Sequence, residues 1–178
     1  MKKIISIAIL SFVFALPFSA QALETRSIDA AILWLVRRVP RHPVHRSDYR
    51  AELAAAIDAA ALETELDAAL ILSIAYHESA LRADARGRIG EIGLMQIHGV
   101  AAAGADLSTP RGQILAGTRW LRACVDRCRS IEGGIARYAT GTTCDPDHTP
   151  RLRYLIASRL ATRAAILAWA GVAAQTPD

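Results

Sequence analysis

One stretch of the chain, residues 68–81, is apolar on almost every side of the helix that its spacing predicts. Such a helix has to be buried, so the rest of the chain must fold around it. Glu78 interrupts this pattern, because it lies seven residues after Ile71 and so on the most apolar stripe. Burial should favour its protonated form, the form that general-acid catalysis requires. An N-cap or a buried ion pair with a nearby arginine is the alternative role.

The rest of the chain is also helical in its patterns. Asp67 is placed to cap the 68–81 helix, Ser47 or Asp48 the helix that follows the prolines, and Thr149 with Pro150 the last one. The turn-rich residues 82–98 should form the lip of a cleft, and no strand-like alternation or internal repeat is present. We therefore predict an all-α fold, with further helices over residues 28–39, 48–62, 110–128, 132–139 and 150–173.

The N-terminus has the three parts of a secretory signal peptide. Lys2 and Lys3 precede an apolar run from Ile4 to Phe18, and a small-residue cleavage site ends at Ala22. A retained membrane anchor, the alternative, needs about 20 apolar residues. No cysteine lies at the cleavage point, so a lipoprotein is not expected and the mature protein should be periplasmic or secreted. We divide the chain into a signal peptide (1–22), an N-terminal helix with a proline-containing linker (23–46) and the main domain (47–178).

Charge and hydropathy restrict the partners of the mature chain. Without Lys2 and Lys3, 19 arginines stand against 17 acidic residues, a net charge of +2. No arginine run has the density of a nucleic-acid-binding surface, so nucleic acid is not an expected partner. The apolar tail 164–174 is too short to span a bilayer, and we expect no stable membrane span after cleavage.

The three cysteines predict one disulfide and one free thiol in an exported protein. Cys124 and Cys128 stand one helical turn apart, which is poor bridging geometry, and Cys144 lies in a later loop. Cys128–Cys144 is the favoured pair because Cys128 is near the helix end, and Cys124–Cys144 is the alternative. No Cys-x-x-Cys pair is present, so we predict no metal site and no other cofactor.

Four segments follow one another in a specific order: Glu78-Ser79, Gly90-Glu91-Ile92-Gly93-Leu94-Met95-Gln96, Gln113–Leu121 and Ala136–Gly141. In order and spacing they resemble the signature segments of the lytic transglycosylases of the soluble SLT type, in the goose-lysozyme-like superfamily. The resemblance covers roughly residues 47–145. It implies a compact lysozyme-like SLT helical domain.

The resemblance also implies a reaction. In that family a single Glu protonates the glycosidic oxygen between N-acetylmuramic acid (MurNAc) and N-acetylglucosamine (GlcNAc). The same Glu then acts as a base on the C6 hydroxyl of MurNAc, which attacks its own C1 and yields 1,6-anhydroMurNAc. The implied substrate is the glycan strand of peptidoglycan. A cell-envelope assembly or secretion-system protein is a candidate partner for targeting, because no wall-anchoring module is recognised in the sequence.

The resemblance assigns roles to individual residues. Glu78 matches the catalytic acid and base, and Ser79 the serine that hydrogen-bonds near the reacting sugar. The hydroxyl of Tyr138 is expected to face Glu78. A helix-terminal hydroxyl is the alternative for Ser79, and core packing for Met95 and Tyr138. Substrate contacts are implied for Ser79, Gly93, Leu94, Met95, Gln96 and Tyr138.

Several positions depart from the family pattern. Gln113 replaces an Asn, Trp120 a Tyr and Ala139 the Asn of the fourth segment, and we expect Trp120 in the core. Glu91 stands in place of an Ala. We interpret Glu91 as auxiliary, paired with Arg86 or Arg88 or touching substrate at the rim.

Two rival functions follow from these departures. One is a hydrolytic muramidase that uses Glu91 or Asp84 as a second carboxylate, because most glycosidases need two. The other is a catalytically silent peptidoglycan-binding scaffold, suggested by the missing Asn at Ala139.

Overall fold

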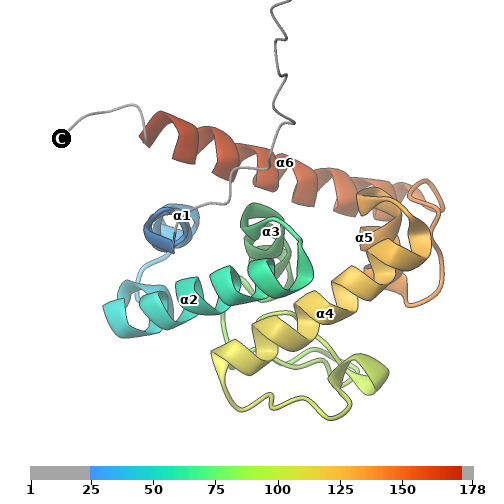
Figure 1. The fold of residues 1–178 in the computed structure, drawn as a ribbon, viewed down its shortest axis with the longest axis horizontal. Helices are drawn as coiled ribbons and strands as arrows, with labels where there is room; N and C mark the ends of the chain where they lie inside the picture. The colour runs from blue at the N-terminus through green and yellow to red at the C-terminus, as the bar shows by residue number, and fades with distance from the viewer. Residues whose placement is uncertain (1–24, 174–178) are drawn as a thin grey trace, which may run out of the picture.

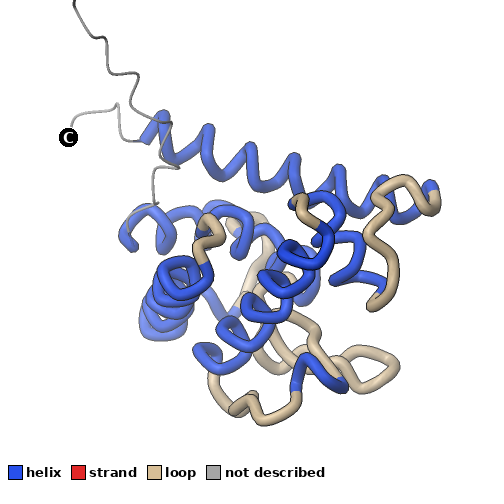
Figure 2. Tube along the Cα trace, turned by 45° about the vertical axis from the view of Figure 1, so that its right-hand side comes forward, coloured by secondary structure: helices blue, strands red, loops and turns tan. Residues whose placement is uncertain are grey.

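The computed structural model describes residues 25–173, so the predicted signal peptide lies outside the described residues. Within them the chain forms helices joined by loops and contains no strand, which confirms the all-α prediction (Figure 2). The elements are α1 (Thr25–Val36), η1 (Pro43–His45), α2 (Ser47–Thr64), α3 (Ala68–Ser79), η2 (Gly99–Ala102), α4 (Pro110–Cys128), α5 (Ile131–Thr140) and α6 (Pro150–Ala173). None of these helices is long and apolar enough to cross a membrane.

Helix α3 is the centre of the molecule. Every residue from 68 to 75 is buried, as its apolar pattern predicts. Helices α1, α2 and α6 pack on it, and α6 runs along one side of the molecule (Figure 1). Helix α4 lies against α2 and α5.

The ends of α3 are set by local signals. Asp67 caps its start, where Oδ1 accepts a hydrogen bond from the Leu70 amide at 2.8 Å. The helix ends where Ala80 adopts a left-handed conformation and its N–H donates to the Tyr76 carbonyl. Glu78 therefore lies in the last helical turn. The predicted cap of α2 was wrong: Arg46 occupies that position without a side-chain cap, and Asp48 pairs with it instead.

Polar contacts set how α6 lies on α3. The buried Ser73 hydroxyl donates to the Arg159 carbonyl at 2.6 Å, and His77 Nε2 is 2.9 Å from Thr162 Oγ1. Arg163 pairs with Asp67 at 2.9 Å, at the other end of α3. These contacts place the middle of α6 against α3, from the N-cap of α3 to its last turn.

The N-terminal segment belongs to the same core. Four residues of α1 are fully buried: Ile28, Ala31, Ile32 and Val36. Arg50 of α2 pairs with Asp29 of α1 at 2.9 Å. After α1, the buried His42 ring lies 2.7 Å from the Ala80 carbonyl through Nε2, while Nδ1 accepts from the Val44 amide. Nε2 is therefore the protonated nitrogen that donates to Ala80.

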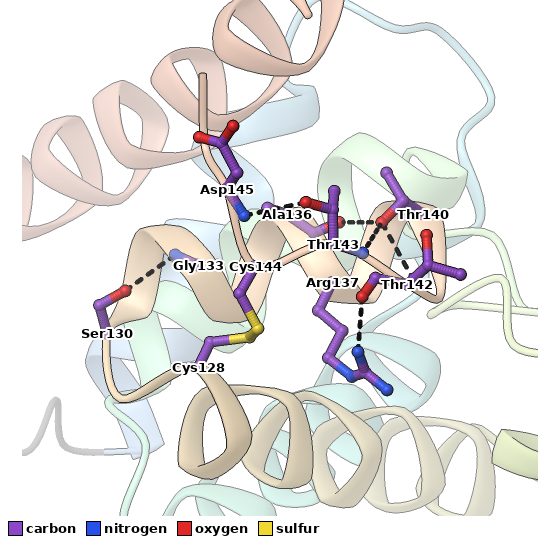
Figure 3. Close-up of a disulfide and its surroundings, with 10 residues drawn as sticks. All are labelled: Cys128, Ser130, Gly133, Ala136, Arg137, Thr140, Thr142, Thr143, Cys144 and Asp145. Atoms are coloured by element: carbon purple, nitrogen blue, oxygen red, sulfur yellow. Dashed lines mark hydrogen bonds between the residues drawn. A yellow bond between two sulfur atoms is a disulfide. The ribbon is translucent and has the colours of Figure 1, made fainter. Parts of the chain in front are cut away.

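The disulfide forms between Cys128 and Cys144, the pair favoured from the sequence, with the two Cα atoms 5.3 Å apart (Figure 3). It joins the last residue of α4 to the loop between α5 and α6. Arg137 adds a hydrogen bond to the Thr142 carbonyl at 2.7 Å, also drawn in Figure 3. Cys124 stays free and buried in α4, and burial raises its pKa to about 11.

Candidate active site

A cleft of about 690 Å³ opens where the last turn of α3 meets the segment 80–109, α5 and α6. Residues 82–98 therefore border a cleft, as predicted. The lining comprises Glu78 from α3, Ile89, Glu91 and residues 96–101 from the turn segment, Trp120 from α4, residues 138–141 at the end of α5, and Arg151, Leu155 and Arg159 from α6.

Glu78 is part of an ion pair within this cleft. Arg159 Nη2 donates to Glu78 Oε1 at 2.6 Å, and the two side chains are 8% and 19% exposed, respectively. Arg159 Nη1 also donates to the Leu155 carbonyl at 3.2 Å. We expected Glu78 to be a buried acid without a charged partner. The structure instead shows the alternative role, a buried ion pair with an arginine. Within residues 25–173, Glu78 Oε2 has no hydrogen-bond donor.

Tyr138 lines the cleft but does not hydrogen-bond to Glu78. Its hydroxyl donates to the Met95 carbonyl at 2.5 Å. Burial, and after it the negative charge of Glu78, raise the pKa of Tyr138 well above its usual value. The hydroxyl therefore stays protonated and holds the 93–97 turn against α5.

Four residues predicted to contact substrate are buried away from the cleft. Ser79 shares its proton between the Ala75 and Leu94 carbonyls, at 3.1 and 3.0 Å, so it has the alternative role of a helix-terminal hydroxyl. Leu94 and Met95 are fully buried in the core, and Gly93 is buried beside them. Met95 packs directly over Gly117 of α4, where a side chain would leave no room. Ser79, Gly93, Leu94 and Met95 build the turn under the cleft and do not line it, and their contact with substrate stays a prediction.

Gln113, a departure from the family pattern, organises that turn. The residue is 3% exposed, and its side-chain amide accepts a hydrogen bond from the Leu94 amide at 2.9 Å and donates to the Ala83 and Leu107 carbonyls. Gly93 has a φ of +70°, and a Cβ there would lie 2.1 Å from Gln113 Oε1. Glycine is required at this position for both reasons.

Gln96 lies in the cleft, where the resemblance predicted a substrate contact. Its backbone has a φ of +45°, a conformation that a non-glycine residue keeps only when its surroundings impose it. The side-chain nitrogen donates to the Gly93 carbonyl at 2.8 Å, and the side-chain oxygen accepts no hydrogen bond from the described residues.

The two candidates for a second carboxylate differ in position. Glu91 lines the cleft, but its Oε2 accepts from the Ile89 amide at 2.9 Å. The backbone N–H groups of Glu91 and Ile89 lower its pKa. The predicted pairing with Arg86 or Arg88 was wrong, since no such ion pair is present in the described residues. Asp84 is 70% exposed, pairs with Arg82 and does not line the cleft.

Other cleft residues were missed by sequence reasoning. Trp120, expected in the core, lines the cleft, and so do Arg151, Leu155 and Arg159 of α6. Arg159 had a usable signal: it lies three residues after Ile156 and seven before Ile166, on the buried stripe of α6. Two opposite charges, each on the apolar stripe of its own helix, predict a buried pair. In the described part of the chain, no cluster of His, Cys, Asp and Glu side chains is placed to bind a metal.

Comparison with known proteins gives the family. The model of the transglycosylase SLT domain matches residues 55–149, more than half of the chain. The match contains Glu78 and the 90–97 turn and ends just before α6. Searches of curated proteins and of solved structures found no match. The protein belongs to the transglycosylase SLT domain family.

Proposed function

We propose that this protein is a peptidoglycan lytic transglycosylase that cleaves the β-1,4 bond between MurNAc and GlcNAc and forms 1,6-anhydroMurNAc. Its family implies a glycan-cleaving transglycosylase that acts on peptidoglycan. The observation that carries the proposal is the position of Glu78. Its side chain lines the cleft from the end of the buried helix α3 and is only 19% exposed, and its Oε2 accepts no hydrogen bond from the described residues, whereas Glu91 is bound by the Ile89 amide.

The two oxygens of Glu78 suggest a division of work. Oε1 is held by Arg159, which fixes the side chain, and Oε2 is free to carry the proton. In the first step Oε2–H protonates the leaving GlcNAc oxygen while the C1–O bond breaks. In the second step the carboxylate takes the proton from the MurNAc C6 hydroxyl while O6 bonds to C1. Glu78 regains its proton, and no water is consumed.

We infer that Arg159 acts mainly by positioning, because its own side chain is anchored by the Leu155 carbonyl. Export to the periplasm or beyond follows from the signal peptide predicted over residues 1–22. A cell-envelope assembly or secretion-system protein is the partner class that we propose for targeting.

The proposal is tested by E78Q. Glutamine keeps the shape of the side chain but carries no transferable acidic proton, so release of muropeptides from purified sacculi should fall by about 10²–10⁴-fold. Mass spectrometry of the products identifies the reaction, because the anhydro sugar is one water lighter than the hydrolysis product. The control is E52Q, the same change at an exposed position of α2. Activity of E78Q above a tenth of wild type would contradict the assignment.

The hydrolytic muramidase is a second candidate because Glu91 lines the same cleft. Its carboxylate is committed to the Ile89 amide, so we expect E91Q to keep at least a tenth of the activity and to release the anhydro product. An inactive E91Q, or reducing-end MurNAc from the wild type, would establish the hydrolase instead. A wild type that binds sacculi and releases nothing would be the silent scaffold.

A further inference from the structure

The arginines of α6 differ in whether they have an acidic partner. There are four: Arg151, Arg153, Arg159 and Arg163. Three have acidic partners, since Arg153 pairs with Asp147, Arg159 with Glu78 and Arg163 with Asp67. Within residues 25–173 Arg151 has none, although it lines the cleft.

Local structure does not account for a cation at position 151. Arg151 lies in the first turn of α6, where the helix dipole disfavours positive charge. The two acids of the cleft are already engaged, Glu78 by Arg159 and Glu91 by the Ile89 amide. The Arg151 guanidinium lines the cleft without an acidic partner among the described residues, so it is available to an anion from outside the protein.

The distance along α6 separates this site from the reacting bond. Arg151, Leu155 and Arg159 lie four residues apart on one face of the helix, and all three line the cleft. Eight residues correspond to about 12 Å along the helix axis, so Arg151 is remote from Glu78, which Arg159 contacts. Arg151 can bind a substrate group but cannot take part in the bond cleavage itself.

We infer that Arg151 binds a carboxylate carried by the MurNAc substituent of the glycan strand, and so makes the enzyme prefer anionic strands. This rests on the proposed function of the cleft. The carboxylate has two chemical sources. In peptide-bearing strands the lactyl carboxyl is consumed in an amide bond, and the stem peptide supplies the free carboxylates. In strands freed of peptide the lactyl carboxylate itself is exposed. We expect the stem peptide to be the source.

The experiment uses three forms of glycan strand. The first bears uncrosslinked stem peptides. The second is the same material after carbodiimide and ammonia have converted its carboxylates to amides, which changes charge but hardly size. The third has been freed of peptide by an amidase. Wild type, R151Q and R153Q are compared on each by kcat/KM. R153Q is the matched control. Arg153 lies two residues from Arg151 and does not line the cleft, so R153Q removes the same charge outside the cleft.

Wild type should cleave the untreated strands about threefold to fivefold better than the amidated ones, as expected for a partly exposed ion pair. R151Q should reduce this ratio to about one through KM, and R153Q should keep it. Preference for the amidase-treated strands over both others, lost only in R151Q, would support the proposal with the lactyl carboxylate as the ligand.

Equal cleavage of all three strands by wild type, or an unchanged preference in R151Q, would overturn the inference and leave the proposed function intact. A wild type that cleaves none of the strands would instead refute the proposed function. The two failures are therefore distinguishable.

Discussion

At the scale of single residues, the pair of Glu78 and Arg159 changes the expected energetics of the site. The two side chains are largely buried, and neither has another charged partner in the described residues. Removing one partner of such a pair leaves the other charge uncompensated, which costs more than the pair contributes. Substituting Glu78 should therefore not stabilise the protein, although burying an isolated carboxylate would be unfavourable.

We predict that E78Q and R159Q each lower the free energy of unfolding by about 1–3 kcal/mol, the cost of leaving a buried hydrogen-bonding group without its partner. The double variant should lose less than the sum, with a coupling of about 1 kcal/mol or more. Urea denaturation of the wild type, the two single variants and the double variant measures this double-mutant cycle. The matched control is the Glu63–Arg119 pair, which has the same N–O distance of 2.6 Å but is 44% and 60% exposed. Its coupling should stay below about 1 kcal/mol, and equal couplings would refute the role of burial.

At the scale of elements, the loop between α5 and α6 connects two walls of the cleft. Residues 138–141 line it from the α5 side, and Arg151 lines it at the start of α6. The Cys128–Cys144 disulfide and the Arg137–Thr142 hydrogen bond hold this loop against the end of α4 and α5. The disulfide should therefore support both stability and the shape of the cleft.

We predict that C128S/C144S loses about 3 kcal/mol of stability by the chain-entropy model. The melting temperature should fall by roughly 6–12 °C, and calorimetry measures this shift. Wild type treated with reductant should melt at the temperature of the double variant. The control is C124A, which removes the free thiol and should remain sensitive to reductant. A double variant that melts like the untreated wild type would show that the disulfide carries no stability.

At the scale of the whole molecule, His42 joins the N-terminal segment to the end of α3 through the Ala80 carbonyl. Burial lowers its pKa, and nearby Arg82 and His45 act in the same direction. His77 lies between α3 and α6. Its pKa is also lowered, mainly by burial and then by the positive charge of Arg159. Both histidines are thus held neutral where α3 meets its neighbours.

Because the unfolded chain binds these protons more readily, the contribution of both histidines is fully present above about pH 6.5. It is lost as the pH falls through the lowered folded-state pKa values. We predict a lower melting temperature at pH 5.5 than at pH 7.5. H42Q should be less stable at pH 7.5 but show a smaller difference between the two pH values. An identical pH dependence in wild type and H42Q would contradict this role.

The sequence alone determined what depends on neighbours along the chain. The apolar spacing of residues 68–81 required a buried helix, Asp67 and Pro110 marked helix starts, and the end of α4 lay close enough to Cys144 for a disulfide. The motif order also identified the family. These features rest on backbone preferences and periodicity, which act over a few residues.

Only the tertiary structure decided which side chains meet. Arg159 reaches Glu78 because Ser73 and His77 fix α6 on α3, and these partners are 81 residues apart in the chain. Met95 is in the core and not in the cleft, because Gly117 of α4 leaves room for it. Periodicity gives the face of each helix but not the helix that covers it, so partners across such distances follow from packing alone.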